Sequence, residues 1–217
     1  SPLAFEADVA RLETAARTFL AEESKRPQDQ QPRGFEVSFG FDTDGGMNHP
    51  DPISLDLGNI TLRLRGKIDR VDKTQHGYIV WDYKTGSAIP YDESDLLSGG
   101  RHLQWALYAH VLNEITALKG SSVPIQSGYY FASDREHCRK MLATPPTKKE
   151  LGEMLQPVLD LAERGSFPPL QKNSQCMFCE YKAICQKDRM LPKNNTSLPG
   201  ADTHPKLIEL AVKWLSN

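Results

Sequence analysis

The stretch GKIDRVDKTQHGYIVWDYKTG, residues 66–86, decides the fold of this chain. It contains two runs rich in residues that favour strands, joined by a short polar link that we expect to turn at Gln75 and His76. This pattern predicts a β-hairpin. The second run also carries Asp82 and Lys84, which share one face of the strand because side chains two residues apart point the same way.

The predicted turn would place Asp69 directly across from Asp82, with their Cβ atoms about 4.5–5.5 Å apart. Opposed carboxylates repel, and the apolar second strand is expected to be half-buried, so this pair needs a counter-charge. A divalent ion such as Mg²⁺ or Mn²⁺ would supply it, because hard cations prefer oxygen ligands. The alternative is a pair of solvated surface acids neutralised by Arg and Lys neighbours. The metal interpretation suits phosphodiester hydrolysis, with Lys84 orienting water or stabilising developing charge.

The composition, with 39% hydrophobic and 25% charged residues among 217, is that of a globular domain. The sequence has no apolar run of membrane-spanning length and no signal-peptide pattern, so we expect a cytoplasmic protein. The net charge of −2 is unevenly spread. Residues 1–60 carry 5 basic against 11 acidic side chains, whereas residues 61–217 carry 21 against 17. The basic excess permits a nucleic-acid partner for the second part.

The rest of the pattern predicts an α/β fold, with a small mixed sheet that has the hairpin at its centre and helices on its faces. Helices are expected over residues 3–25, 101–118 and 147–165, and Pro157 would kink the last one or mark its real start. Strands are expected over residues 35–41, 59–72, 77–86 and 123–133. We expect one domain over residues 1–190, followed by a Pro/Asn-rich linker and a terminal amphipathic helix over 191–217.

Alternation along residues 59–72 predicts an apolar face on one side of the first hairpin strand. The other face would carry three basic side chains beside Asp69, and we expect them to contact a phosphate backbone. These basic residues are Arg63, Arg65 and Lys67.

The runs GKIDRVD, VWDYKTG and LQWALYA, in this order, resemble the motif series of the RecB-family branch of the PD-(D/E)xK nuclease superfamily. The resemblance implies a restriction-endonuclease-like core and metal-dependent cleavage of DNA. Asp69 and Asp82 would then bind Mg²⁺ or Mn²⁺ with the backbone carbonyl of Tyr83. Lys84 would be the catalytic lysine.

The same resemblance assigns Gln104 and Tyr108 to the catalytic centre, beside the DNA. The two residues are four apart and share a helix face, although a polar residue and a half-buried tyrosine on an amphipathic helix would look the same. Glu36 matches a glutamate on the family's preceding strand, or it is a surface acid. Family members usually have a metal-binding histidine upstream of this strand, but no histidine precedes His49.

Cys176, Cys179 and Cys185 have a C-x2-C-x5-C spacing, which favours metal ligands over disulfides in an intracellular protein. Zinc or a [4Fe–4S] cluster would need a fourth ligand. The segment resembles the C-terminal end of the iron–sulfur nucleases related to AddB, whose fourth cysteine lies far upstream and is absent from this chain. Cys138 is either a substitute or a buried, inert thiol. We expect a C-terminal domain cut from a longer protein, which would explain the missing histidine, the missing cysteine and the start at Ser1.

Together these features predict the exonuclease domain of a bacterial helicase–nuclease used in double-strand-break repair and recombination. Its partners would be DNA and a helicase–nuclease subunit or an upstream helicase-like region. The sequence has no Walker pattern, so ATP-driven movement would reside elsewhere. The alternative is a catalytically inactive module that keeps the fold for DNA binding or subunit docking. Retention of Asp69, Asp82 and Lys84 argues against this alternative.

Overall fold

The computed structural model describes residues 2–43, 45–120, 125–133, 135–165 and 180. The chain divides into two compact units, residues 1–149 and residues 150–217. The first unit contains helices α1 (Pro2–Ser24) and α2 (Gln104–Leu118) and all the described strands. Helix α3 (Lys148–Glu163) lies almost entirely in the second unit. The domain boundary expected at residue 190 lies outside the described residues and stays a prediction.

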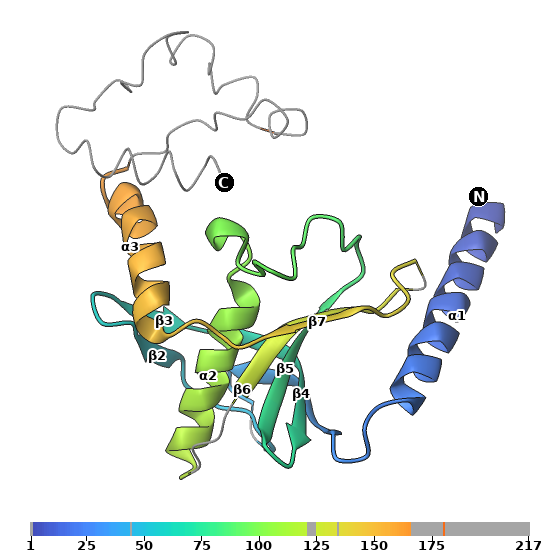
Figure 1. Cartoon of the computed structure of the whole chain (residues 1–217), viewed down its shortest axis with the longest axis horizontal. Helices are drawn as coiled ribbons and strands as arrows, with labels where there is room; N and C mark the ends of the chain where they lie inside the picture. Colours follow the sequence, from blue (N-terminus) through green and yellow to red (C-terminus); the bar gives the residue numbers. More distant parts are fainter. Residues whose placement is uncertain (1, 44, 121–124, 134, 166–179, 181–217) are drawn as a thin grey trace, which may run out of the picture. The chain divides into compact units, whose positions relative to one another are not determined.

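A five-stranded sheet forms the centre of the first unit (Figure 1). Its strands follow the order β1, β4, β5, β6, β7, and β5 and β6 are parallel whereas the other neighbours are antiparallel. The bounds are β1 Gln31–Phe39, β4 Gly66–Thr74, β5 Gly77–Lys84, β6 Ile125–Phe131 and β7 Lys140–Ala143. The predicted mixed α/β fold with the hairpin near the middle of the sheet is therefore confirmed.

The hairpin formed by β4 and β5 has the predicted register, because Thr74 pairs with Gly77 and the turn falls on the two residues between them. The paired ladder runs from this turn to Arg70 and Trp81. Asp69 and Asp82 are the next residues along the two strands. The ladder between β4 and β5 thus ends immediately before the two acids.

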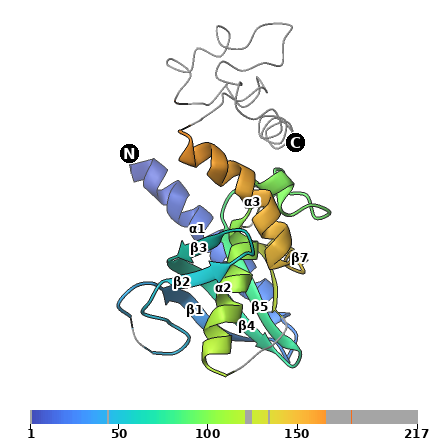
Figure 2. The ribbon, with the colours of Figure 1, turned by 90° about the vertical axis from the view of Figure 1, so that its left-hand side faces the viewer.

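Helices α1 and α2 pack on opposite faces of the sheet, and both were predicted. Val71 and Val80 of the hairpin pack with Leu112 of α2 in one buried core. Phe19 of α1 packs on the other face, against a cluster that includes Trp81. Figure 2 shows α2 crossing one face of the sheet. We call these the α2 face and the α1 face.

The prediction of a single strand over residues 59–72 is wrong, because this segment forms parts of two sheets. Strand β3 (Thr61–Leu64) pairs with β2 (Ile53–Asp56) in a separate two-stranded sheet, and β4 begins at Gly66. The corner between β3 and β4 is tightly packed. A Cβ atom at Gly40, which has a φ of 77°, would lie 2.5 Å from the Arg65 Cβ, and one at Gly66 would lie 3.1 Å from the Phe39 ring.

The expected strand over residues 35–41 is also corrected. Strand β1 begins earlier and ends at Phe39, and Val37 and Phe39 are buried as expected. Phe35 is 61% exposed and Phe41 lies beyond the strand. Glu36 has a φ of 48°, and this left-handed conformation interrupts the alternation of side chains along the strand. The four aromatic and aliphatic positions therefore do not share one face.

Two further strands, β2 and β7, were not expected from the sequence. Helix α3 contains Pro157 in its interior, so the interpretation of Pro157 as the real start of this helix is wrong. None of the described helices combines the length and the apolar character needed to span a membrane. The predicted linker and terminal helix over 191–217 lie outside the described residues.

Candidate active site

Asp82 and Lys84 lie on the α2 face of β5. Strand alternation places them on the same side as Val80, which is buried in the core beneath α2. The Asp82 side chain is 1% exposed and that of Lys84 is 27% exposed, and their charged groups form an ion pair. The alternative of a solvated surface acid therefore does not describe Asp82.

Asp69 reaches the same place from β4. Its Oδ2 accepts a hydrogen bond of 2.8 Å from the backbone N–H of Tyr83. The sequence predicted direct cross-strand pairing of Asp69 with Asp82, but the paired ladder ends one residue earlier. The charge of Asp69 nevertheless acts on Asp82 and raises its pKa. The structure thus brings the two carboxylates together at the opening between the strands.

The environment of Asp82 disfavours its charged form. Burial is the main cause that raises the pKa of Asp82, and repulsion by Asp69 adds to it, whereas the Lys84 ammonium acts in the opposite direction. The Oδ2 atom of Asp82 is buried, and the Lys84 ammonium is the partner that the structure gives it among the described residues. A buried carboxylate oxygen in this condition suits a cation as an additional partner.

Helix α2 contributes Gln104 and Tyr108 to the same face. The Lys84 ammonium lies 3.4 Å from Gln104 Oε1, and Gln104 Nε2 donates to the Tyr108 hydroxyl at 2.8 Å. Burial raises the pKa of Tyr108, and the charges of Asp82 and Asp69 raise it further. Asp82, Lys84, Gln104 and Tyr108 therefore form one connected group, and the charge of Asp69 acts on two of its members.

Lys84, Gln104 and Tyr108 line a cleft of about 440 Å³. Its walls come from β5, the first turns of α2, the segment before α2 and the corner between β3 and β4. The polar and basic lining residues are Arg65, Lys84, Arg101, His102, Gln104 and Tyr108. This concave and basic surface beside two carboxylates suits an anionic ligand.

A family model for the PD-(D/E)XK nuclease superfamily matches residues 3–186, well over half of the chain. The chain belongs to the PD-(D/E)XK nuclease superfamily. This membership indicates phosphodiester hydrolysis with a divalent metal ion and a nucleic-acid substrate. A search of curated proteins finds no match.

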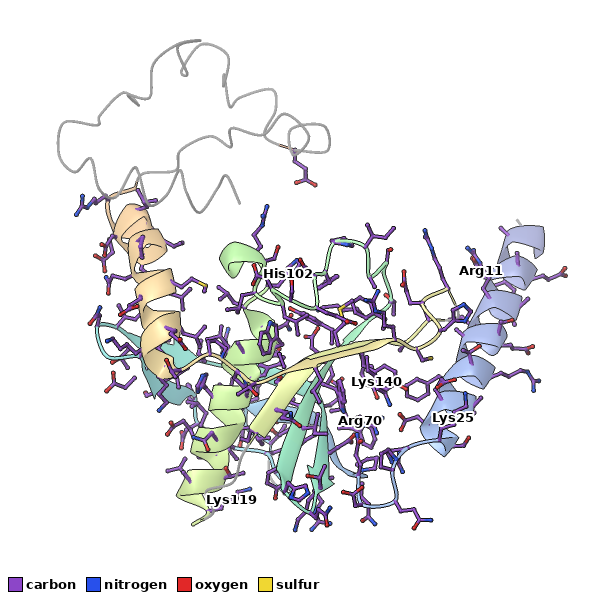
Figure 3. All side chains as sticks on the ribbon, in the orientation of Figure 1. Arg11, Lys25, Arg70, His102, Lys119 and Lys140 are labelled. Atoms are coloured by element: carbon purple, nitrogen blue, oxygen red, sulfur yellow. The ribbon has the colours of Figure 1, made fainter. Side chains whose placement is uncertain are left out.

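Arg101 and His102 of this nuclease were missed by the sequence reasoning. Both line the cleft, and His102 lies beside the start of α2 (Figure 3). Burial lowers the pKa of His102, and the charges of Arg101 and Lys84 lower it further, so both effects favour the neutral imidazole. A signal was present, because the two basic residues immediately precede the LQWALYA run.

Tyr129 is a second residue that the motifs did not identify. It lies on β6 opposite Asp82 in the parallel register, and its side chain is 2% exposed. The Lys84 ammonium lies 5.4 Å from the centre of its ring. A cation over an aromatic face is attracted by the ring electrons, so Tyr129 helps to hold Lys84. No local pattern could have indicated this neighbour, because it is set by the pairing of distant strands.

The three basic residues predicted to share a strand face are separated in the nuclease. Arg63 lies on β3 and Lys67 lies on β4, where its ammonium is 3.6 Å from Glu36. Arg65 lies at the corner between these strands and lines the cleft. The three residues therefore do not lie on one strand, because the chain changes sheets at this corner. The predicted role of these residues in DNA binding stays a prediction.

Glu36 has the exposure of a surface acid, since 65% of its side chain is accessible. Its neighbours in β1, Phe35 and Val37, pair with Arg70 and Ile68 of β4, so Glu36 lies across the sheet from Asp69. Its carboxylate forms an ion pair with Lys67. The structure gives Glu36 no contact with Asp82 or Lys84 among the described residues.

The acidic residues of the site fit a hard divalent cation. No group of three or more His, Cys, Asp or Glu side chains that could hold a metal occurs among the described residues. Asp69 and Asp82 supply two carboxylates, and the buried Oδ2 atom of Asp82, which the Lys84 ammonium alone contacts among the described residues, supports the fit. Mg²⁺ is commonly bound by one or two carboxylates, with water or substrate phosphate completing its coordination.

The remaining predictions concern the four cysteines. Cys176, Cys179 and Cys185 lie outside the described residues, so their clustering stays a prediction. Cys138 is described and is 5% exposed, within the apolar cluster of the α1 face.

Proposed function

We propose that this chain is a Mg²⁺- or Mn²⁺-dependent DNA exonuclease domain of the RecB-like class. The observation that carries the proposal is the position of Lys84, which forms an ion pair with the buried Asp82 and lines a basic cleft. The reacting phosphate of a nucleic acid would lie in this cleft, next to both groups. Superfamily membership supports hydrolysis as the reaction.

Asp69 and Asp82 would hold the metal ion together with the backbone carbonyl of Tyr83. When bound, the ion polarises the scissile phosphate and acidifies the attacking water. Asp82 is shielded from solvent, so its charge acts on the ion with little screening by water. The N–H of Tyr83 holds Oδ2 of Asp69, and the metal ion would bind the other oxygen.

Lys84 would stabilise the negative charge that develops on the phosphate as water attacks phosphorus and the bond to the leaving oxygen breaks. Its ammonium contacts Gln104 Oε1 and the face of the Tyr129 ring. These contacts restrict a long and flexible side chain before the substrate arrives. Gln104 is in turn held by Tyr108, so it acts as a positioning residue for Lys84.

The lining of the cleft supports a nucleic acid as the ligand. Arg65 and Arg101 place two guanidinium groups on its walls, and such groups bind phosphate without regard to sequence. The first turn of α2 also lines the cleft, and a helix N-terminus favours anions. A volume of about 440 Å³ is enough for about one nucleotide.

The wider role we propose is resection of DNA ends within a bacterial helicase–nuclease used in double-strand-break repair and recombination, in the cytoplasm. The resemblance of the motif series to RecB-family nucleases supports this role. The cysteines Cys176, Cys179 and Cys185 would hold a [4Fe–4S] cluster or zinc together with a ligand from another part of the intact protein.

A second candidate is a catalytically inactive module that binds DNA or docks a subunit. The observation in its favour is that only two acidic side chains, without a third metal-ligating side chain among the described residues, meet at the site. Such a site would bind a metal ion weakly. The two candidates differ in whether DNA is cleaved at saturating Mn²⁺.

The test is cleavage of end-labelled linear DNA and of circular single-stranded DNA, with Mg²⁺, Mn²⁺ or EDTA. Exonuclease activity predicts metal-dependent release of mononucleotides or short products from linear DNA, and intact circles. Asp82→Asn is the matched inactive control, because it preserves the shape of the side chain and removes its charge. Cleavage that persists in Asp82→Asn would indicate a contaminating nuclease. Tight DNA binding by wild-type protein without cleavage at saturating Mn²⁺ would overturn the proposal and favour the inactive module.

A further inference from the structure

A buried cluster of polar side chains occupies the α1 face of the hairpin. Arg70 is 1% exposed and donates from Nε and Nη2 to the Asp72 carboxylate, at 2.6 and 3.0 Å. Its Nη1 lies 2.8 Å from Glu23 Oε2 of α1 and donates to the Tyr83 hydroxyl at 3.1 Å. Figure 3 shows Arg70 on the side of the sheet nearest α1. All three nitrogen atoms of the guanidinium group therefore have acceptors.

Asp72 completes this cluster from β4. Its carboxylate is fully buried and also accepts hydrogen bonds from Trp81 Nε1 at 3.1 Å and Gln30 Nε2 at 2.6 Å. A buried ion pair in which every nitrogen and oxygen atom has a partner has one preferred geometry, because any displacement leaves a charge or a polar group unpaired. The planar guanidinium of Arg70 is consequently held in a fixed position.

Tyr83 connects this cluster to the candidate active site. Because side chains alternate along β5, its ring points to the α1 face, whereas Asp82 and Lys84 point to the α2 face. Its hydroxyl accepts from Arg70, and its backbone N–H donates to Asp69 Oδ2. Both contacts cross from β5 to β4 just beyond the end of the paired ladder at Arg70 and Trp81. Beyond Arg70 and Trp81, these two contacts therefore connect β4 and β5 where the backbone hydrogen bonds of the ladder have ended.

We propose that Arg70 is a positioning residue, which holds the Tyr83 hydroxyl and thereby keeps the Tyr83 N–H aligned with the Asp69 carboxylate. Glu23 and Asp72 fix Arg70, Arg70 fixes Tyr83, and Tyr83 fixes Asp69 beside Asp82. The Asp-Arg-Val-Asp run of residues 69–72 thus serves both faces of the sheet. Its first acid faces the active site, and its arginine and second acid keep that acid in place. The use of Asp69 as a metal ligand rests on the proposed function, whereas its positioning does not.

The test compares two variants of the full chain that each remove one hydroxyl from the same cluster. Tyr83→Phe removes the group that Arg70 holds. Tyr130→Phe is the matched control, because its hydroxyl donates to Glu23 Oε1 at 3.1 Å, whereas Arg70 contacts Glu23 Oε2, which Arg26 also holds. Hydrogen exchange of the residue 83 amide, measured without metal, reports the bond to Asp69. We expect this exchange to accelerate about tenfold in Tyr83→Phe, the scale of weakening one hydrogen bond, and to stay unchanged in Tyr130→Phe.

Mn²⁺ affinity, measured by electron paramagnetic resonance, is the second readout. Loss of a group that orients a metal ligand typically weakens binding by about tenfold or more, so we expect this change in Tyr83→Phe and none in the control. Arg70→Lys keeps the positive charge but lacks the planar fork, and should reproduce both effects of Tyr83→Phe. Tyr83→Phe is the decisive variant if Arg70→Lys does not fold.

Equal amide exchange in Tyr83→Phe and in wild-type protein would overturn the positioning role of Arg70. Equal acceleration in both tyrosine variants would also overturn it, because it would show a general loosening of the cluster. Absence of Mn²⁺ binding by wild-type protein, with accelerated exchange confined to Tyr83→Phe, would refute the proposed metal site and leave the positioning of Asp69 supported.

Discussion

On the α1 face of the hairpin, the carboxylate of Asp72 is fully buried and accepts hydrogen bonds from Arg70, Trp81 and Gln30. On the α2 face, Asp82 is buried to the same degree, yet the Lys84 ammonium is the one partner of its Oδ2 within the described part of the chain. Burial raises the pKa of Asp82, and the nearby charge of Asp69 raises it further.

This difference in the number of partners indicates a structural role for Asp72 and a chemical role for Asp82. A buried charge with all its partners is held in place and gains nothing from a ligand. A buried charge with incomplete partners is costly to the folded protein, and a cation that binds it offsets this cost. The same two strands carry both kinds of acid, so the α1 face acts as a scaffold for the α2 face.

The largest effect is expected from Asp82→Ala, which removes the acid with incomplete partners. Mn²⁺ binding and DNA cleavage should both fall to background, because Asp69 alone supplies too few ligands. Isothermal titration with Mn²⁺ and a cleavage assay at saturating DNA check this outcome. Mn²⁺ affinity equal to that of wild-type protein would show that Asp82 on β5 is not a ligand of the metal ion.

Arg70→Met should break the completed cluster on the α1 face. It leaves the buried Asp72 carboxylate without its cationic partner, and such a loss typically costs about 3–5 kcal/mol in the free energy of unfolding. Arg139→Met is the control, because the Arg139–Glu93 pair is about half exposed and should contribute less than about 1 kcal/mol. Urea unfolding measures both values. A similar small loss in the two variants would contradict the scaffold role of the α1 face.

Lys84→Ala should separate binding from catalysis on the α2 face. We expect turnover to fall by about 10²–10³, the scale of removing one preorganised charge-stabilising group, while metal and DNA binding stay largely intact. Single-turnover cleavage and fluorescence anisotropy on a noncleavable DNA measure the two effects. Undiminished cleavage, in protein shown to be free of other nucleases, would refute the role of Lys84.

Arg65→Ala should weaken binding of noncleavable DNA and reduce the slope of log affinity against log salt by about one. Arg65 lines the cleft, whereas Arg63 lies on β3 and is absent from the cleft lining. Arg63→Ala is therefore the matched comparison and should change the slope less. Equal changes in the two variants would show that DNA follows the strand surface predicted from the sequence rather than the cleft.

The smallest effect concerns the pH dependence of stability in metal-free protein. Because the pKa of Asp82 is raised by folding, its ionised form disfavours the folded state at neutral pH, and this cost disappears as the pH falls below the ordinary range of an aspartate. Asp82→Asn should therefore have a higher melting temperature than wild-type protein at pH 7, and the difference should vanish near pH 3. Calorimetry in EDTA checks the sign. A variant less stable than wild-type protein at pH 7 would contradict it.

Much of the fold followed from local patterns. The turn at Gln75 and His76, helix α2 and the pairing of β4 with β5 were all predicted, because each depends on the alternation or helical spacing of a few neighbouring residues. Strand β7 was missed because it is only four residues long. Strand β2 was missed beside a segment rich in Gly, Pro and Asp, which indicates a loop.

The sequence by itself determined that Asp69, Asp82 and Lys84 meet in one hairpin, because residues two apart on a strand share a face and the turn sets the register. The tertiary structure alone decided that Asp82 is buried, that Arg65 but not Arg63 reaches the cleft, and that Arg70 connects α1 to Asp69 through Tyr83. These outcomes depend on close contacts between residues far apart in the chain, such as Gly40 with Arg65 and Glu23 with Arg70. Local patterns carry no information on such contacts, because packing and the solvation of charge are set by what the folded chain places around each group.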